Sequence, residues 1–424
     1  MTSNRLPEHW PLSALLVGFP VWWLLGVHMF IWPAFAAVMA ARLVVRPATI
    51  RVPRGFGLWI LFLLWMLVSA VGLDGGGVPI SFAWRASSYL SMTVFFLYVY
   101  NTPRELLPAE RVVKILGVFW LIVVAGGWLG VLFPNGNFST PFERILPANV
   151  ASDPFVQQLV HPVFAQVHEI LGFPLGRPTA PFVYTNDWGS VYALLLPVFV
   201  IGWLQADRHD RRIRAYAILA ASMVPAFVSL NRGLWLSLFV ALGYAATRVG
   251  NFGDRARRAF VGITVLGVVL VAFTPLGTLV EARAENQHSN DGRTFLYEES
   301  VKTAMESPLV GHGGPVPYEG AGRIIPLVGT QGQFWLVLVS QGFVGTVLFL
   351  GFLLRMAMAT RRGPSLTFWC HVVLVIGLVQ LLVYDMIPVP LHLIFVVVAL
   401  GMREAEAEAA DAASAAGREH EVVA

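Results

Sequence analysis

The sequence predicts an all-α polytopic membrane protein with about twelve transmembrane helices and both termini in the cytoplasm. Of the 424 residues, 56% are hydrophobic and only 13% are charged, and the mean hydropathy is +0.67. Soluble folds of this size do not have such a composition. Apolar runs long enough to cross roughly 30 Å of hydrocarbon recur along the whole chain, and α-helices satisfy their own backbone hydrogen bonds there. A β-barrel would show short alternating segments instead.

The apolar runs define twelve expected spans, of which the first two are short and closely joined. Two long loops interrupt them, at about residues 133–187 and 277–333, and we expect short amphipathic helices in these loops. We treat residues 1–403 as a single transmembrane domain and residues 404–424 as an acidic cytoplasmic tail that we expect to be disordered. The spans cover residues 12–27, 29–45, 56–73, 82–100, 112–132, 188–204, 214–230, 234–248, 259–276, 334–354, 366–384 and 388–402.

The distribution of basic residues sets the orientation of these spans. With the N-terminus in the cytoplasm, 21 of the 29 Lys and Arg residues lie inside and 8 lie outside, as the positive-inside rule requires. Both long loops are then extracytoplasmic, so they hold nearly all of the extramembrane mass and are where we expect a site. The arginines on that side that need an explanation are Arg177, Arg232, Arg293 and Arg323.

The same sequence excludes several other classes of function. The net charge of +4 comes from basic residues spread over membrane-flanking loops, so we expect no nucleic-acid partner. The single cysteine, Cys370, lies in an expected span, which rules out an intramolecular disulfide and a cysteine-based metal site. We expect no cleavable signal peptide, because the first apolar run lacks a small-residue cleavage motif.

The first long loop contains an amphipathic pattern over residues 155–171. Its apolar residues fall within about half of a helical wheel, so we expect a helix that lies in the headgroup plane and caps the bundle. Pro162 should kink or split this helix. His161 and His168 lie on the polar half. They are most simply solvated histidines, and the alternatives are a metal pair or an acid/base pair.

The second long loop contains a turn at residues 290–292 and an expected helix over residues 293–306. Arg293 would then lie on the first turn of a helix, where a cation is poorly placed unless an anion binds there. Free backbone N–H groups and a guanidinium would converge on such an anion. The alternative is a pairing of Arg293 with a neighbour such as Asp291 or Glu298.

Arg232 lies in SLNRGLW, a segment with almost no loop between two expected spans. Its guanidinium must therefore lie at or just inside the outer membrane face. Charged groups in that position are costly without partners and are usually functional. We expect Arg232 to bind a ligand.

Four segments, in their order and sidedness, resemble the O-antigen ligase and polymerase superfamily. They are FVYTNDWGSVYALLLP at 182–197, SLNRGLW at 229–235, GRTFLYEESVKTAMESPLVGHG at 292–313 and GTQGQFWLVLVSQGFVG at 329–345. The resemblance covers roughly residues 180–350. It implies that Arg232 and Arg293 match two family arginines thought to hold the diphosphate of an undecaprenyl-diphosphate-linked glycan donor.

The resemblance implies an inverting, metal-independent glycosyltransferase without a cofactor in the bacterial cytoplasmic (inner) membrane. Its active face would be extracytoplasmic, and it would transfer an oligosaccharide from undecaprenyl diphosphate to a glycan or lipid acceptor. Arg177 and Arg323 are further candidates for binding the donor diphosphate. Whether the acceptor is another repeat unit, as in a polymerase, or a separate anchor, as in a ligase, stays open.

One position departs from the family pattern. Family ligases carry a histidine, often followed by asparagine, just before the span that begins here near Phe334, and this chain has Gln331 in its place. Glutamine can hydrogen-bond a sugar hydroxyl but cannot take its proton at neutral pH. His312 is the nearest substitute, or no base is needed because diphosphate is already a good leaving group. The carboxylate candidates are Glu298, Glu299, Glu319 and Asp74.

Two other classes of function stay open from the sequence. A multi-span transporter or flippase of an anionic solute or lipid-linked glycan would also show a few arginines among many spans. Such proteins usually place their charges near mid-membrane and often contain an internal repeat, which we do not find. A scaffold for a surface-polymer complex is the third reading, but solitary arginines in large Gly- and Pro-containing outer loops favour a ligand site.

Overall fold

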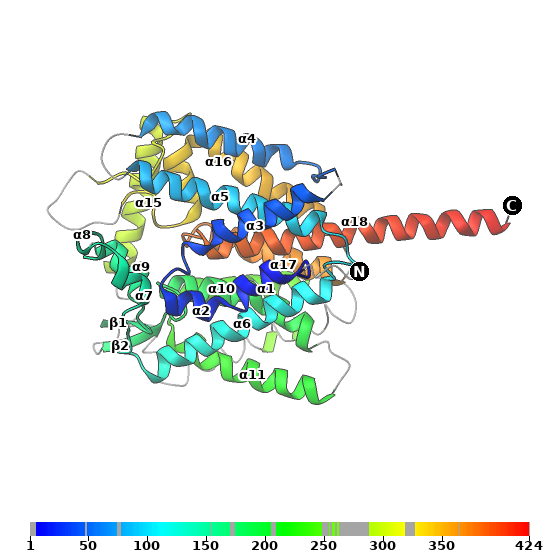
Figure 1. Cartoon of the computed structure of the whole chain (residues 1–424), viewed down its shortest axis with the longest axis horizontal. Helices are drawn as coiled ribbons and strands as arrows, with labels where there is room; N and C mark the ends of the chain where they lie inside the picture. The colour runs from blue at the N-terminus through cyan, green and yellow to red at the C-terminus, as the bar shows by residue number, and fades with distance from the viewer. Residues whose placement is uncertain are drawn as a thin grey trace.

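The computed structural model describes residues 6–46, 49–73, 78–152, 154–169, 174–204, 209–247, 254, 257–258, 261–262, 288–318, 327–363 and 365–423. This part of the chain is mostly α-helical, and its strands form a single two-stranded hairpin. Most of the helices run along the long axis of the molecule (Figure 1). The predicted fold class, all-α, is confirmed by this architecture.

The first half of the chain contributes one side of the bundle. Large aromatic side chains fill its interior, and Trp32, Trp59 and Trp120 are fully buried. Helix α3 packs on α5, and α6 packs on α10 of the second half. The elements are α1 (Trp10–Leu16), α2 (Phe19–Leu25), α3 (Ile31–Val45), α4 (Phe56–Ser69), the 3-10 turn η1 (Ala70–Gly72), α5 (Val78–Asn101) and α6 (Ala109–Leu132).

The second half supplies the helices that close the core. Helix α18 packs against α5 and α17, and α10 packs against α17. The longitudinal elements are α10 (Thr185–Phe199), the π-helical turn η2 (Val200–Leu204), α11 (His209–Val228), α12 (Arg232–Ala246), α16 (Gln333–Thr360), α17 (Ser365–Gln380) and α18 (Val389–Val423).

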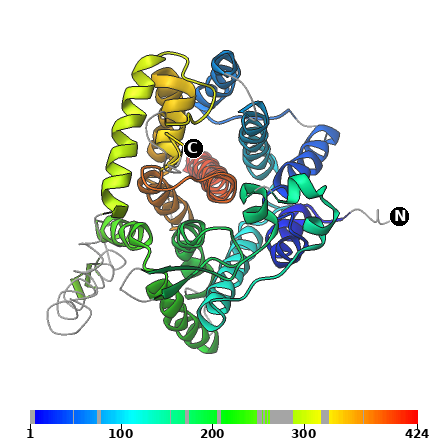
Figure 2. The same ribbon diagram turned by 90° about the vertical axis from the view of Figure 1, so that its left-hand side faces the viewer.

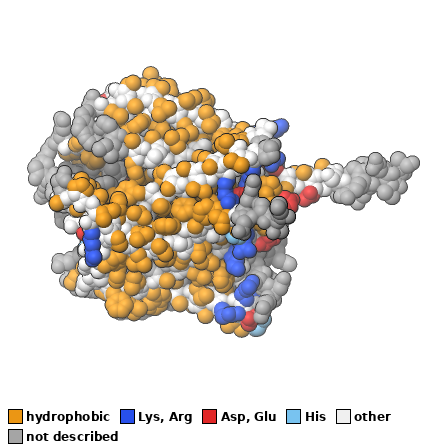
Figure 3. All heavy atoms as spheres, in the orientation of Figure 1, with side chains coloured by type: hydrophobic (Ala, Val, Ile, Leu, Met, Phe, Trp, Pro, Cys, Tyr) orange, Lys and Arg blue, Asp and Glu red, His pale blue; other side chains and the backbone are white. Residues whose placement is uncertain are grey.

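These helices coincide with eleven of the twelve expected spans, and the ninth, 259–276, lies almost wholly outside the described residues. Two of them, α6 and α16, are long and apolar enough to cross a membrane by length and composition. Hydrophobic side chains cover the wall of the bundle on the face drawn in Figure 3, and most Lys and Arg side chains gather at the end from which α18 projects. Twelve spans and their orientation remain a prediction from hydropathy and charge.

The opposite end of the molecule, which we call the outer end after the predicted orientation, carries the short elements (Figure 1). They are α7 (Pro141–Ile145), α8 (Ala148–Ala151), α9 (Pro154–Val160) and the antiparallel strands β1 (Ala165–Glu169) and β2 (Pro174–Pro178), in which Gln166 faces Arg177. Helix α15 (His288–Glu306) runs along one side of the bundle when it is viewed end-on (Figure 2).

Two expected helices in the outer loops have different bounds. The amphipathic helix of the first loop ends at Val160 rather than near residue 171, because Pro162 cannot continue it and residues 165–169 pair with β2 instead. Helix α15 begins at His288, five residues before the expected start. Gly292 is therefore inside the helix, at a cost of about 1 kcal/mol relative to Ala, and Arg293 lies in the second turn rather than the first.

Helix α18 leaves the bundle and continues to Val423, so it includes the tail that we expected to be disordered (Figure 1). The tail alternates Glu with Ala from residue 404 to 409, and both are strong helix formers. Exposed side chains begin a few residues past Glu404.

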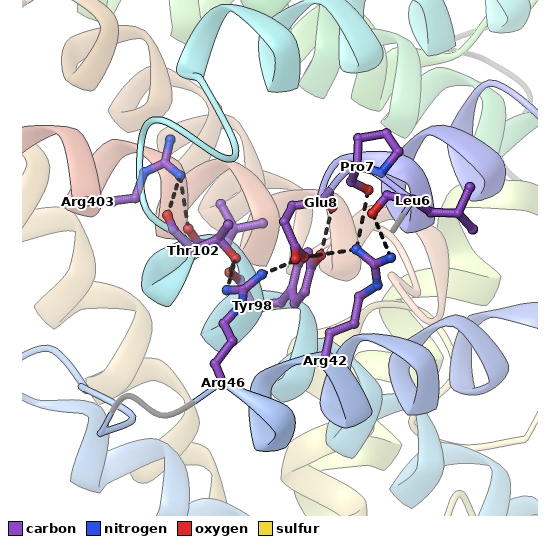
Figure 4. A network of polar contacts seen from close by, with 9 residues as sticks. Leu6, Pro7, Glu8, Arg42, Arg46, Tyr98, Thr102 and Arg403 are labelled. Carbon is purple, nitrogen blue, oxygen red and sulfur yellow. Dashed lines mark hydrogen bonds and ion pairs between the residues drawn. The ribbon is translucent and has the colours of Figure 1, made fainter. Parts of the chain in front are cut away.

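A polar network ties the N-terminal segment to the helices at this inner end (Figure 4). Glu8 accepts hydrogen bonds from Arg42 at 3.0 Å and from the hydroxyl of Tyr98 at 2.6 Å, and pairs with Arg46 at 2.5 Å. Burial would raise the pKa of Glu8, but these three partners lower it below its usual value. The network holds the inner ends of α1, α3 and α5 together.

Candidate functional site

The connector between α17 and α18, residues 381–388, lies at the outer end and is held by the start of α16. The backbone N–H of Gln333 donates to the carbonyl of Tyr384 at 2.7 Å. Its fully buried side chain accepts a hydrogen bond from the backbone N–H of Met386 at 3.3 Å and donates to the hydroxyl of Tyr89 at 2.7 Å. Gln333 therefore fixes the peptides on both sides of Asp385.

Asn231 joins this connector to the start of α12 and α10. As the N-cap of α12, its side-chain oxygen accepts a hydrogen bond from the backbone N–H of Leu234 at 3.2 Å, and it also accepts one from the hydroxyl of Tyr384. Its side-chain nitrogen donates to the carbonyl of Thr185 at 3.1 Å. The residue before it, Leu230, has a φ of 46°, a strained conformation for a branched side chain.

Steric crowding explains why the residue after Arg232 is a glycine. A Cβ atom at Gly233 would lie 2.3 Å from the Tyr384 hydroxyl oxygen. Any larger residue would push the connector away from α12. The Arg-Gly pair of the sequence thus places an exposed arginine on the first residue of α12 directly beside the Tyr384–Asn231 contact.

Two further predicted arginines lie around Tyr384. The guanidinium groups of Arg293, on α15, and Arg177, on β2, both act electrostatically on the Tyr384 side chain. Arg177 also donates from Nε to the carbonyl of Ser229 at 2.6 Å, just before Asn231. The structure therefore brings Arg177, Arg232 and Arg293 to the same connector, and Arg323 lies outside the described residues.

Two carboxylates that the sequence analysis did not single out lie in the same region, outside the expected spans. Burial raises the pKa of Asp187, on the first turn of α10, to about 8, and the charge of Asp385 adds to this effect. Burial also raises the pKa of Asp385, against the opposing effect of backbone N–H groups and Arg85. The Asp385 side chain is nevertheless accessible to solvent.

The sequence does contain a signal for both carboxylates. Asp187 directly precedes the sixth expected span, and Asp385 lies between the last two spans. A lone acidic residue at the outer end of a span is unusual, but hydropathy does not reveal that two such residues share a site. Arg85 was missed because it falls inside the fourth expected span, where its charge acts on Asp385.

The two predicted catalytic residues occupy defined places nearby. His312 is held by a hydrogen bond from its backbone N–H to the carbonyl of Val339 at 3.0 Å, and its ring Nε2 lies 2.9 Å from the carbonyl of Thr303 on α15. The next residue, Gly313, contacts Arg85 through its carbonyl at 3.4 Å. Gln331 is half-buried in the turn that precedes α16, two residues before Gln333.

The other candidate residues from the sequence have different partners, are exposed, or lie outside the described residues. His161 lies 3.0 Å from the Glu143 carboxylate and 3.2 Å from the Asn137 side-chain oxygen, so it is hydrogen-bonded rather than freely solvated. Among the residues that the structure describes, no cluster of three His, Cys, Asp or Glu side chains could hold a metal ion. Glu299 pairs with Lys302 at 2.6 Å and Glu298 is exposed. The side chains of His168, Glu319 and Asp74 lie outside the described part.

A comparison with known families finds a match. A family model described as O-antigen ligase matches residues 215–350, which include α12, α15 and the first part of α16. Arg232, Arg293, His312 and Gln331 lie inside this region, whereas Asp187 and Asp385 lie outside it. No curated protein matches the chain. The match covers less than half of the chain, and it supports the resemblance to the O-antigen ligase superfamily and, in general terms, a membrane protein with a glycosyltransferase type of activity.

Proposed function

We propose that this protein transfers a glycan from an undecaprenyl-diphosphate-linked donor to a hydroxyl group of a glycan or lipid acceptor, at the extracytoplasmic face of the membrane. The observation that carries the proposal is the arrangement around residues 381–388. Arg177 and Arg293 both act on Tyr384, Arg232 follows its hydrogen-bond partner Asn231, and Asp385 is the next residue along the chain.

The three arginines supply what a lipid diphosphate needs. A guanidinium stays charged and can donate two parallel hydrogen bonds to phosphate oxygens. Arg232 is the first residue of α12, whose dipole favours an anion at that end. Positive charge preorganised at the leaving group stabilises the charge that develops as the diphosphate departs. The proposed step therefore uses neither a metal ion nor a cofactor, and Arg323 remains a fourth candidate for binding the diphosphate.

The two carboxylates supply a base. The pKa of Asp187, raised to about 8, keeps that side chain mostly protonated at neutral pH. The charge of Asp385 contributes to the raised pKa of Asp187, and burial raises the pKa of Asp385 itself, which makes Asp385 a stronger base than an ordinary carboxylate. We prefer Asp385 to His312, because the His312 ring is engaged with the Thr303 carbonyl. Gln331 remains the candidate for a hydrogen bond to an acceptor hydroxyl.

The reaction is a single displacement. The acceptor hydroxyl passes its proton to Asp385 while its oxygen forms a bond to the anomeric carbon. The bond from that carbon to the phosphate oxygen breaks, and the undecaprenyl diphosphate leaves with the electron pair, held by the arginines. Attack from the face opposite the leaving group inverts the anomeric configuration.

The test uses purified protein in nanodiscs and the total glycolipid extract of host cells from which the gene has been deleted. Such cells accumulate the unused donor, and their extract also supplies lipid acceptors. We expect the wild-type protein to consume the lipid diphosphate and yield a larger glycan, and Asp385→Asn to slow this by about 100-fold or more. Asp210→Asn, which removes an exposed carboxylate at the inner end, is the matched control. A wild-type protein that leaves the glycolipids chemically unchanged, or only moves them across a vesicle membrane, would favour the transporter reading instead.

A further inference from the structure

Two stacked aromatic side chains at the outer end have no part in the step described so far. Tyr297, on α15, and Trp335, on α16, have ring centroids 4.6 Å apart and ring planes 20° apart. Both side chains are partly exposed. Tyrosine and tryptophan are common at membrane interfaces, so a role in ligand binding needs evidence beyond their position.

The polar groups of both rings are used on one backbone carbonyl. The hydroxyl of Tyr297 donates to the carbonyl of Leu382 at 3.3 Å, and the indole Nε1–H of Trp335 donates to the same oxygen at 3.0 Å. Tyrosine and tryptophan in an interfacial belt usually direct these groups to headgroups and water. Here the protein takes both donors, which fixes the two rings, so the pair offers ring faces rather than hydrogen bonds.

The Tyr297–Trp335 pair is anchored to the same connector as the candidate site. Leu382 precedes Asp385 by three residues in this connector. Arg293 lies one helical turn before Tyr297 on α15, and side chains at this spacing have Cβ atoms roughly 5–6 Å apart. Helices α15 and α16 pack side by side (Figure 2). The pair therefore borders the position of a diphosphate bound by Arg293.

The chemistry of a ring face selects one part of the donor. An aromatic face carries partial negative charge, so it attracts the partly positive C–H hydrogens of a sugar ring and gains nothing from a diphosphate. In the donor, the sugar and the isoprenoid chain lie on opposite sides of the diphosphate. The reacting carbon belongs to the sugar, and the proposed base Asp385 is on the connector that holds the pair. The sugar is therefore the part of the donor that fits beside these rings.

We propose that Tyr297 and Trp335 form a stacking platform for the sugar ring that is attached directly to the donor diphosphate. This inference rests on the proposed glycosyl transfer and assigns a part of the donor that the arginines do not bind. The rings form no covalent bond. They hold the sugar so that its anomeric carbon faces the acceptor.

The test compares two ligands that differ only in the glycan. One is undecaprenyl diphosphate, and the other is the intact lipid-linked glycan purified from cells that lack the gene. We expect the wild-type protein in nanodiscs to bind the intact donor about 10-fold or more tighter than undecaprenyl diphosphate. Trp335→Leu and Tyr297→Leu should remove most of this preference and leave the Kd for undecaprenyl diphosphate within about two-fold.

Two further variants serve as controls. Trp335→Phe keeps an aromatic face but loses the indole N–H, so it should retain part of the preference for the glycan. Trp128→Leu removes a half-buried tryptophan near the outer end of α6 and should leave the preference unchanged. A role in the interfacial belt alone would make the leucine variants of the pair weaken both ligands equally or neither.

That equal effect would overturn the platform, as would a wild-type protein that binds both ligands with the same Kd. The transfer reaction is judged separately, because a wild-type protein that converts no glycolipid rejects it whatever the ratio of the two Kd values. If Trp335→Leu does not yield folded protein, Tyr297→Leu must lose the preference for the glycan and Trp335→Phe must retain part of it, or the proposal fails.

Discussion

The hydroxyl of Tyr384 donates a hydrogen bond to the side-chain oxygen of Asn231, and this contact joins positions 153 residues apart in the sequence. One partner precedes Arg232 and the other precedes Asp385. The contact therefore sets the position of a proposed donor-binding arginine relative to the proposed base.

We expect Tyr384→Phe to loosen this link without emptying the core. Loss of one buried hydrogen bond costs about 1 kcal/mol of folding stability, and Arg232 should then bind undecaprenyl diphosphate less tightly. Tyr244→Phe is the matched control, because it removes a hydroxyl that pairs with His371 elsewhere in the bundle. Equal donor affinity in the two variants would mean that the link does not position Arg232.

Gly233→Ala tests the close approach of the connector to α12. Its Cβ would collide with the Tyr384 hydroxyl oxygen, so we expect a lower melting temperature and weaker donor binding. Gly57→Ala, in α4, has no atom within 4 Å of the new Cβ and should stabilise the helix by up to about 1 kcal/mol. If both variants melt at or above the wild-type temperature, the steric argument is wrong.

The pKa of Asp187 predicts the alkaline limb of activity. As the pH rises through about 8, Asp187 ionises and places a second negative charge beside Asp385 and the departing diphosphate. Turnover by the wild-type protein should therefore fall above that pH. Asp187→Asn cannot ionise, so it should retain activity and lose this limb, whereas Asp210→Asn should keep it. An alkaline limb that persists in Asp187→Asn must come from another group.

The same carboxyl should make folding stability depend on pH. Its pKa in the folded protein, about 8, is above the ordinary aspartate value of 3.8, so the folded state binds the proton more tightly. The stabilising effect is complete below about pH 4 and is lost as the pH rises to about 8. Melting curves of wild type and Asp187→Asn between these pH values should diverge, with the wild type losing more stability. Parallel curves would show that Asp187 is not desolvated.

Gln333 and Gln331 should behave differently although they are two residues apart. Gln333→Ala leaves the Tyr89 hydroxyl and the Met386 N–H without their partner, at about 1–3 kcal/mol for each unsatisfied group. It should lower both melting temperature and turnover. Gln331→Ala should leave the melting temperature unchanged and raise only the KM for the acceptor, as its proposed hydrogen bond to that substrate requires.

Hydropathy predicted most of the fold, since helices fill eleven of the expected spans. The pattern failed where helix and strand compete locally. Residues 155–171 have a helical apolar period, but Pro162 ends the helix and pairing with β2 makes the rest a strand. The start of α15 was misplaced because Gly292 resembles a turn residue and is in fact tolerated inside the helix.

The site could be predicted in part. Arg232 and Arg293 stand out because charges at an outer membrane face need partners, and the structure places both around residues 381–388. Asp187 and Asp385 could not be paired from the sequence, because 198 positions separate them and only tertiary packing brings them together. Arg85 was hidden by the apolar residues of its own span.

The most direct test of the donor site is the binding of undecaprenyl diphosphate to the purified protein in nanodiscs. We compare wild type with Arg232→Ala, Arg293→Ala and the control Arg144→Ala. We expect micromolar or tighter binding. Each of the first two substitutions should weaken it by about 10-fold or more, or about 1.4 kcal/mol, and the control should leave the Kd within about two-fold of wild type. Absent binding, or binding that neither Arg232→Ala nor Arg293→Ala changes, would contradict a diphosphate site at these arginines.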